Sequence, residues 1–118
     1  MSLSSPSVRS VAFLLALSTP MAGILAGQAL AAAPAKVSVA IKGFAFVPQV
    51  VTVAPGTTVT WTNADEDPHT VVADDKGFRS AALDSDDSYS FTFTKPGDYA
   101  YFCSLHPHMT GKIIVKAG

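Results

Sequence analysis

The chain has 118 residues, enough for one domain, with eight Lys and Arg against nine Asp and Glu and a net charge of −1. This balance excludes the strongly basic surface of nucleic-acid-binding domains. A single cysteine, Cys103, also excludes an internal disulfide.

The first 31 residues differ in composition from the rest and predict a signal peptide. Arg9 is their only charge, and an uncharged apolar run covers residues 11–33. Small residues at the end of this run favour cleavage after Ala31, with Ala33 and Ala35 as alternative sites. A retained membrane anchor is the other interpretation, which a proline and two glycines in the run disfavour. The sequence therefore predicts periplasmic export and a mature domain at residues 32–118.

The mature segment predicts an all-β domain. Alternating apolar residues and Pro-Gly turns indicate strands at residues 37–41, 43–46, 47–53, 57–63, 69–73, 88–94, 98–103 and 111–117. No run of ten or more residues in this segment has helical periodicity. Seven or eight short strands favour a two-sheet antiparallel Greek-key β-sandwich.

The stretch YFCSLHPHMTG gathers the only thiol, two of the three histidines and a methionine. Strand alternation places Cys103 on the same face as Tyr101, so its thiol should point inward at the end of the strand. The residues that follow form a loop bent by Pro107, and His69 begins another strand that can reach the same pole. A thiolate, imidazoles and a thioether together are typical of a type 1 copper site. Zinc usually takes carboxylate, water or further Cys or His ligands in place of methionine.

Two other functions compete with electron transfer. The same ligands could hold Cu(I) in a periplasmic copper carrier or storage protein, although such proteins typically have Met-rich or Cys-x-x-Cys sites. Alternatively, Cys103 could be the nucleophile of a thiol enzyme with His106 or His69 as its base. Nothing in the sequence supplies an oxyanion site for that chemistry, and a lone buried cysteine is usually only a small apolar core residue.

The motif C-x-x-H-x-x-M after a strand, with N-x-x-x-x-x-H upstream, resembles the cupredoxins and most closely the amicyanins. The short spacing from Cys103 through His106 to Met109 marks that subgroup. The resemblance covers essentially the whole mature domain. It implies one type 1 copper ion, with His69, Cys103 and His106 as equatorial ligands and Met109 as the axial ligand.

The resemblance also assigns roles to the residues around the ligands. It implies that Asn63 hydrogen-bonds Ser104, the residue after the cysteine, and that Pro68 contributes a backbone carbonyl near the copper. Phe102 occupies a position that could serve as a lateral electron exit.

His106 should lie at the surface, as the entry and exit point for electrons. Leu105, Pro107 and His108 would frame it as a small contact patch. His108 replaces the aromatic residue usual in amicyanins, and motif matching favours His106 over His108 as the loop ligand.

Four protein ligands leave no open position for a substrate, so the sequence predicts a one-electron shuttle and not an enzyme. We expect a monomer without a small-molecule substrate or nucleic-acid partner. Its partners would be redox proteins, such as a dehydrogenase or oxidase and a cytochrome. The acidic run Asp65, Glu66 and Asp67 stands where amicyanins have more apolar residues, which predicts a more basic partner.

Overall fold

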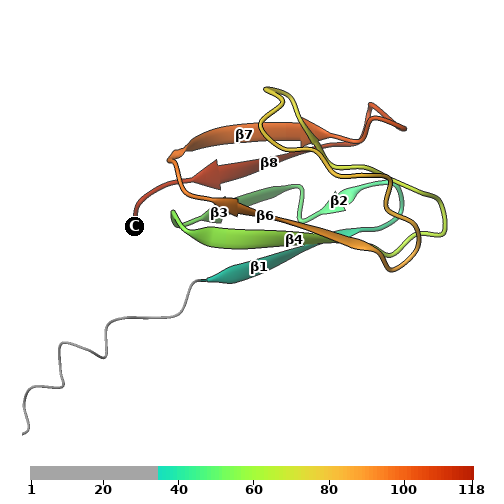
Figure 1. Ribbon diagram of the computed structural model, residues 1–118, viewed down its shortest axis with the longest axis horizontal. Helices are drawn as coiled ribbons and strands as arrows, with labels where there is room; N and C mark the ends of the chain where they lie inside the picture. Colours follow the sequence, from blue (N-terminus) through green and yellow to red (C-terminus); the bar gives the residue numbers. More distant parts are fainter. Residues whose placement is uncertain (1–34) are drawn as a thin grey trace, which may run out of the picture. The chain divides into compact units, whose positions relative to one another are not determined.

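The computed structural model describes residues 35–118 (Figure 1), so the predicted signal peptide at residues 1–31 lies outside the described residues. These residues form eight strands and contain no α-helix. Within this part of the chain, therefore, no helix is long and apolar enough to cross a membrane. The strands are β1 Lys36–Ile41, β2 Phe46–Val47, β3 Val50–Val53, β4 Thr57–Asn63, β5 Val72–Ala73, β6 Ser88–Phe93, β7 Gly97–Phe102 and β8 Thr110–Val115.

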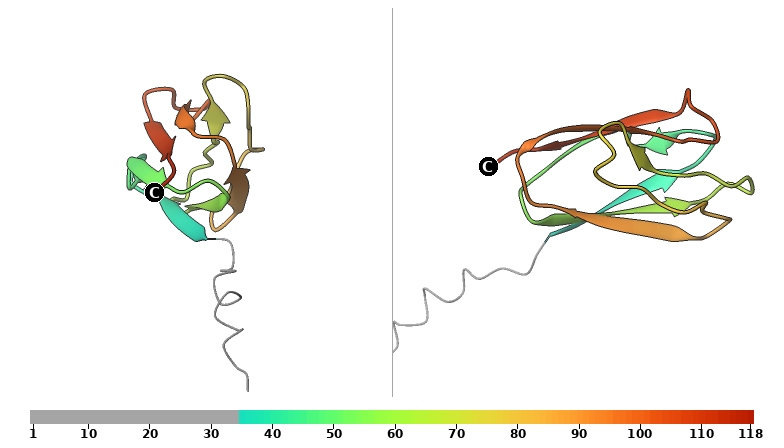
Figure 2. Two further views of the ribbon diagram at one scale, coloured as in Figure 1. Left: turned by 90° about the vertical axis from the view of Figure 1, so that its left-hand side faces the viewer. Right: turned by 45° about the horizontal axis from the view of Figure 1, so that its top comes forward.

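The strands form two four-stranded sheets, in the orders β2-β1-β4-β6 and β3-β8-β7-β5. Figure 1 shows β7 and β8 in one layer and β1, β4 and β6 in the other, and Figure 2 gives two further views of the same layers. The predicted all-β sandwich of two sheets is confirmed.

Two strand pairs are parallel, a difference from the wholly antiparallel pairing that we expected. β1 pairs with β4 and β3 pairs with β8 in parallel, and the other pairs are antiparallel. The physical reason is that the chain leaves the first sheet after β2, contributes β3 to the second sheet, and then returns with β4 beside β1. The C-terminal ends of β1, β4 and β7 lie at the same pole of the sandwich (Figure 1).

Aromatic side chains fill the space between the sheets. Trp61 of β4 is fully buried, and its ring lies 5.3 Å from that of Tyr101 on β7 and 5.9 Å from that of Phe78. The expected inward direction of Tyr101 and Cys103 is confirmed, since the two residues are 1% and 0% exposed. Burying such large rings contributes much of the stability of a small domain.

The predicted strand at residues 69–73 is shorter than expected. Only Val72–Ala73 forms a strand, as β5, whereas His69 makes an isolated bridge with Leu83. The His69 N–H donates to the Leu83 carbonyl at 3.1 Å, and the Leu83 N–H donates to the His69 carbonyl at 2.7 Å. The loop residue Leu83 therefore forms the backbone hydrogen bonds of His69 in place of a neighbouring strand. This pairing fixes the position of the His69 imidazole.

Candidate metal centre

The predicted ligand residues come from two segments that lie far apart in the sequence. His69 lies between β4 and β5, whereas Cys103, His106 and Met109 lie in the connection from β7 to β8. Antiparallel pairing of β7 with β8 forms a hairpin, and the pairing of β5 with β7 brings the two segments together.

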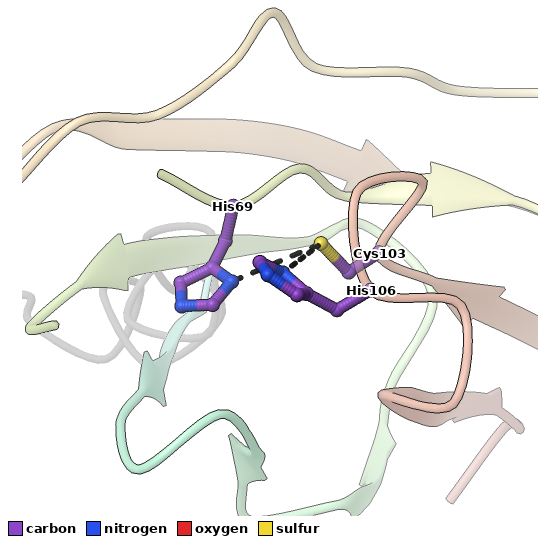
Figure 3. Close-up of side chains that lie close together, drawn as sticks. All are labelled: His69, Cys103 and His106. Carbon is purple, nitrogen blue, oxygen red and sulfur yellow. Dashed lines mark hydrogen bonds between the residues drawn. The ribbon is translucent and has the colours of Figure 1, made fainter. Parts of the chain in front are cut away.

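Three donor side chains converge on one point, as Figure 3 shows. The Sγ of Cys103 lies 3.8 Å from Nδ1 of His69 and 3.8 Å from Nδ1 of His106. All three donor atoms lie within 4.8 Å of one another. His69 and Cys103 are both 0% exposed, whereas His106 is partly exposed. Among the described residues, this is the group of His, Cys, Asp and Glu side chains close enough to share a metal ion.

Backbone hydrogen bonds shape the loop that carries three of the predicted ligands. The His106 N–H donates to the Cys103 carbonyl at 3.2 Å, and the Met109 N–H donates to the His106 carbonyl at 2.9 Å. The Cys103 N–H in turn donates to the Met109 carbonyl at 3.1 Å, which closes the loop. Met109 is thus held beside Cys103, and it is 2% exposed. Its role as the axial ligand stays a prediction.

Thr70 connects the His69 segment to the cysteine loop, a contact that sequence reasoning missed. Its backbone N–H donates to Sγ of Cys103 at 3.3 Å. Its hydroxyl oxygen accepts the Ser104 N–H at 2.7 Å and lies 2.8 Å from the Ser104 hydroxyl. Hydrogen bonds to the cysteine sulfur are among the factors that tune a blue-copper site. The position of Thr70 directly after a predicted ligand histidine was the sequence signal that could have indicated this contact.

The expected bond from Asn63 to Ser104 is wrong. The Asn63 side-chain amide donates instead to the carbonyls of Asp67 and Leu83, at 2.8 Å and 2.9 Å. Its side-chain oxygen accepts the Asp65 N–H at 2.9 Å. Asn63 ends β4 and is fully buried. Its short side chain therefore forms hydrogen bonds with the backbone that follows the strand and does not reach the cysteine loop. It therefore braces the loop that leads to His69.

Asp65 of the acidic run points into the pole and not toward solvent. Its carboxylate lies 3.0 Å from Nε2 of His69, and its side chain is 14% exposed. The N–H groups of Gly43 and Phe44 donate to its two oxygens, at 2.7 Å and 2.9 Å. The hydrogen bond from the Phe44 N–H is the main cause that lowers the pKa of Asp65 below its ordinary value, with smaller contributions from Gly43 and His69 against desolvation. Asp65 is therefore an anion that braces the site.

The remaining predicted residues lie around the rim. His108 is exposed and is not part of the three-residue group, with its ring centroid 6.5 Å from that of His106. Leu105 is 49% exposed and Pro107 is also exposed. Pro68 is exposed immediately before His69, and its predicted carbonyl contribution stays a prediction.

The donor set fits a type 1 copper ion. One thiol and two imidazole nitrogens at mutual distances below 4.8 Å match three equatorial ligands. A buried methionine from the same loop can supply a weak axial thioether. The buried surroundings, with an N–H donor on the sulfur, are those expected around a copper thiolate.

Comparison with known proteins identifies the family. A model of the cupredoxin-like domain matches residues 8–115 of the chain. The chain belongs to the cupredoxin-like family. Its relatives include amicyanin-alpha of Methylorubrum extorquens, which is 35% identical over an alignment that covers 92% of this chain and 100% of that protein.

Two further cupredoxins are similar to this chain. Amicyanin of Paracoccus versutus is 37% identical over 68% of this chain, and the alignment spans 64% of that protein, less than two thirds of its length. A solved amicyanin mutant in its Cu(I) form is 35% identical, with a TM-score of 0.65, over 75% of this chain and 88% of that one. The predicted membership of the cupredoxins, with amicyanins among the relatives, is confirmed.

Proposed function

We propose that this chain is an exported one-electron carrier that holds a single type 1 copper ion. The observation that carries the proposal is the convergence of the buried Cys103 thiol with Nδ1 of His69 and Nδ1 of His106, each 3.8 Å from the sulfur. These three residues would hold the ion, with Met109 as a fourth and weaker ligand. When bound, copper supplies the reversible exchange of one electron between Cu(II) and Cu(I).

The surrounding chain keeps the donors in place and keeps water away from them. Cys103 and His69 are fully buried, and Met109 is 2% exposed. Backbone hydrogen bonds close the loop from Cys103 to Met109, and Thr70 ties that loop to the His69 segment. A site that holds its ligands in one arrangement suits both oxidation states. Four protein donors also leave no position for a substrate, which supports a carrier and not an enzyme.

His106 supports a surface route for the electron. It is the partly exposed member of the donor group, and exposed Leu105 and Pro107 flank it in the same loop. Phe44, 41% exposed, contacts its ring edge-on at 4.9 Å between centroids. An apolar patch around an exposed ligand can dock a partner protein briefly and without a large desolvation cost. Phe102 is partly buried, and a lateral exit through it stays a prediction.

The partners are redox proteins, such as a dehydrogenase or oxidase and a cytochrome. Glu66 and Asp67 are exposed beside this pole, whereas Asp65 is engaged inside it. Two exposed carboxylates would favour a partner with a basic rim, mainly through the association rate. The predicted leader at residues 1–31 supports a periplasmic location.

The first experiment is a visible absorption spectrum of the purified protein after addition of Cu(II). We expect an intense blue band from thiolate-to-copper charge transfer. The band should vanish in Cys103→Ala, weaken or vanish in His106→Ala, and survive in the matched control His108→Ala. It should bleach with one electron of reductant and return with oxidant.

One outcome would reject this function, and another would change the assignment of the loop ligand. A colourless or pale copper protein would mean that the sulfur does not bind Cu(II), and the copper-carrier function would replace the electron carrier. Loss of the band in His108→Ala but not in His106→Ala would assign the loop ligand to His108.

A further inference from the structure

The carboxylate of Asp65 joins three separate segments at the copper pole. It accepts hydrogen bonds from the backbone of Gly43 and Phe44, in the turn between β1 and β2, and it contacts the ring of His69. Asp65 itself follows β4, and its own N–H is held by Asn63. These several partners hold the Asp65 carboxylate in one orientation. The carboxylate in turn restrains the turn backbone and the His69 ring.

The contact with His69 determines which ring nitrogen carries the proton. Nδ1 of His69 faces the Cys103 sulfur at 3.8 Å, so it must be free to bind a metal. Nε2 lies 3.0 Å from a carboxylate oxygen, which can only accept a hydrogen bond in its ionised form. Nε2 therefore carries the hydrogen and donates it to Asp65. A carboxylate partner fixes the tautomer of a ligand histidine and raises the basicity of the opposite nitrogen.

The backbone of the turn between β1 and β2 has an unusual conformation that the same carboxylate stabilises. Gly43 and Phe44 have φ angles of 63° and 57°, both in the left-handed region. That region is unfavourable for a phenylalanine, so a specific interaction is needed to hold it there. Successive N–H groups in such a turn converge into a small anion-binding concavity. Here the anion is the side chain of Asp65.

The held turn places the Phe44 ring against both predicted ligand histidines. The ring meets His69 at 5.0 Å and 89°, and His106 at 4.9 Å and 83°, in edge-to-face contacts. Edge-to-face packing is directional, so it restrains the tilt of each imidazole. Since His106 comes from a loop and is partly exposed, this ring is its main aromatic support outside the donor group.

We propose that Asp65 and Phe44 form a clamp that positions both ligand imidazoles and shifts the redox equilibrium of the site toward Cu(II). The clamp rests on the proposed function for its redox effect. Asp65 acts through His69, by holding its tautomer and increasing its donor strength. Its negative charge also favours the more positive oxidation state of an ion held by His69. Phe44 acts by packing against both rings and supplies no charge.

The test compares Asp65→Asn with the matched control Glu66→Gln, which removes a neighbouring exposed charge from the same loop. Loss of a carboxylate partner of a ligand histidine typically weakens metal binding about 10–100-fold. We expect Asp65→Asn to weaken Cu(II) binding by about that factor and Cu(I) binding less. The reduction potential should rise by about 59 mV for each tenfold difference between the two. Glu66→Gln should change it much less, and equal shifts in the two variants would overturn the proposal.

A second measurement, of the His69 tautomer, needs neither copper nor a substitution. Long-range ¹H–¹⁵N NMR of the metal-free wild-type protein should show His69 with hydrogen on Nε2, whereas hydrogen on Nδ1 would overturn the clamp. Phe44→Ala should keep this tautomer but increase the exchange broadening of the His106 ring signals. Unchanged His106 signals would remove Phe44 from the clamp. The tautomer measurement stays decisive if no blue band forms, so failure of the proposed function and failure of the clamp are distinguishable.

Discussion

The backbone N–H of Thr70 donates to Sγ of Cys103 at 3.3 Å, directly after a predicted ligand histidine. The Thr70 hydroxyl oxygen meanwhile accepts the Ser104 N–H at 2.7 Å. One residue thus connects the two segments that supply the donor group. Its N–H contacts the sulfur, and its hydroxyl contacts both the sulfur, at 3.8 Å, and the N–H of the next residue of the loop. Since the N–H and the hydroxyl are different groups of Thr70, the N–H contact with the sulfur can be separated experimentally from the contacts of the hydroxyl.

Thr70→Val should destabilise the metal-free protein and leave the contact of the Thr70 N–H with the sulfur in place. The substitution removes only the hydroxyl, so the part-buried N–H of Ser104 loses its acceptor. Leaving a buried donor unsatisfied costs about 1–3 kcal/mol. Chemical denaturation measures this loss. The control Thr58→Val breaks an exposed hydroxyl pair with Thr92 and should change the free energy of unfolding by less than about 0.5 kcal/mol. Equal losses in both variants would contradict a special role for Thr70.

Met109→Leu tests whether Met109 is a metal ligand or only a core residue. Because the exchange nearly conserves volume in a buried position, we expect the metal-free protein to lose less than about 1.5 kcal/mol of stability. The copper protein should nevertheless change its reduction potential clearly, since the axial ligand tunes a blue-copper site. Ile113→Leu, at another buried position, serves as the control for repacking. A potential that moves no more in Met109→Leu than in this control would mean that Met109 is only core.

The Tyr101→Phe variant should lose less unfolding free energy at high pH than the wild-type protein. Burial raises the pKa of Tyr101 to about 12, from an ordinary value near 10. Because the folded state binds this proton more tightly, its contribution to stability is complete below about pH 10 and is lost as pH rises through about 12, at about 1.4 kcal/mol per pH unit. Unfolding free energies of both proteins between pH 7 and 12 measure the difference. Parallel curves of unfolding free energy against pH for the two proteins would contradict the raised pKa of Tyr101.

The same substitution should be neutral or stabilising at pH 7. The Tyr101 hydroxyl is buried and makes no well-formed hydrogen bond among residues 35–118, although, against the larger effect of desolvation, the nearby indole N–H of Trp61 lowers its pKa. Removing an unsatisfied buried hydroxyl relieves a desolvation cost. A clear loss of stability at neutral pH would indicate that the hydroxyl does have a partner.

Gly111→Ala should destabilise the β7–β8 hairpin. A Cβ atom at Gly111 would overlap with Cζ and Oη of Tyr101, its cross-strand partner. The buried ring would have to move, and such overpacking costs about 1–3 kcal/mol. Thermal or chemical unfolding measures the loss. The penalty should shrink in a Tyr101→Leu background, whereas an unchanged penalty there would exclude the ring as its cause. Gly118→Ala meets nothing within 4 Å and should have no effect.

The sequence by itself determined most of the strands, the inward face and which side chains gather as possible donors. Period-two alternation depends only on neighbouring residues, so the alternation at Trp61 and Tyr101 identified buried side chains without a structure. Cys103, His106 and Met109 lie within one loop, and their close spacing already constrained them to a common point.

Only the tertiary structure decided which side chains support that group. The contacts of Thr70 with Ser104, and of Asp65 with Gly43 and Phe44, join residues that are 34, 22 and 21 positions apart. Nothing in local spacing indicates such contacts, because they depend on how the two sheets pack and where the chain crosses between them. The expected partner of Asn63 was wrong for the same reason, since a short side chain can act only on what the fold brings within hydrogen-bond distance.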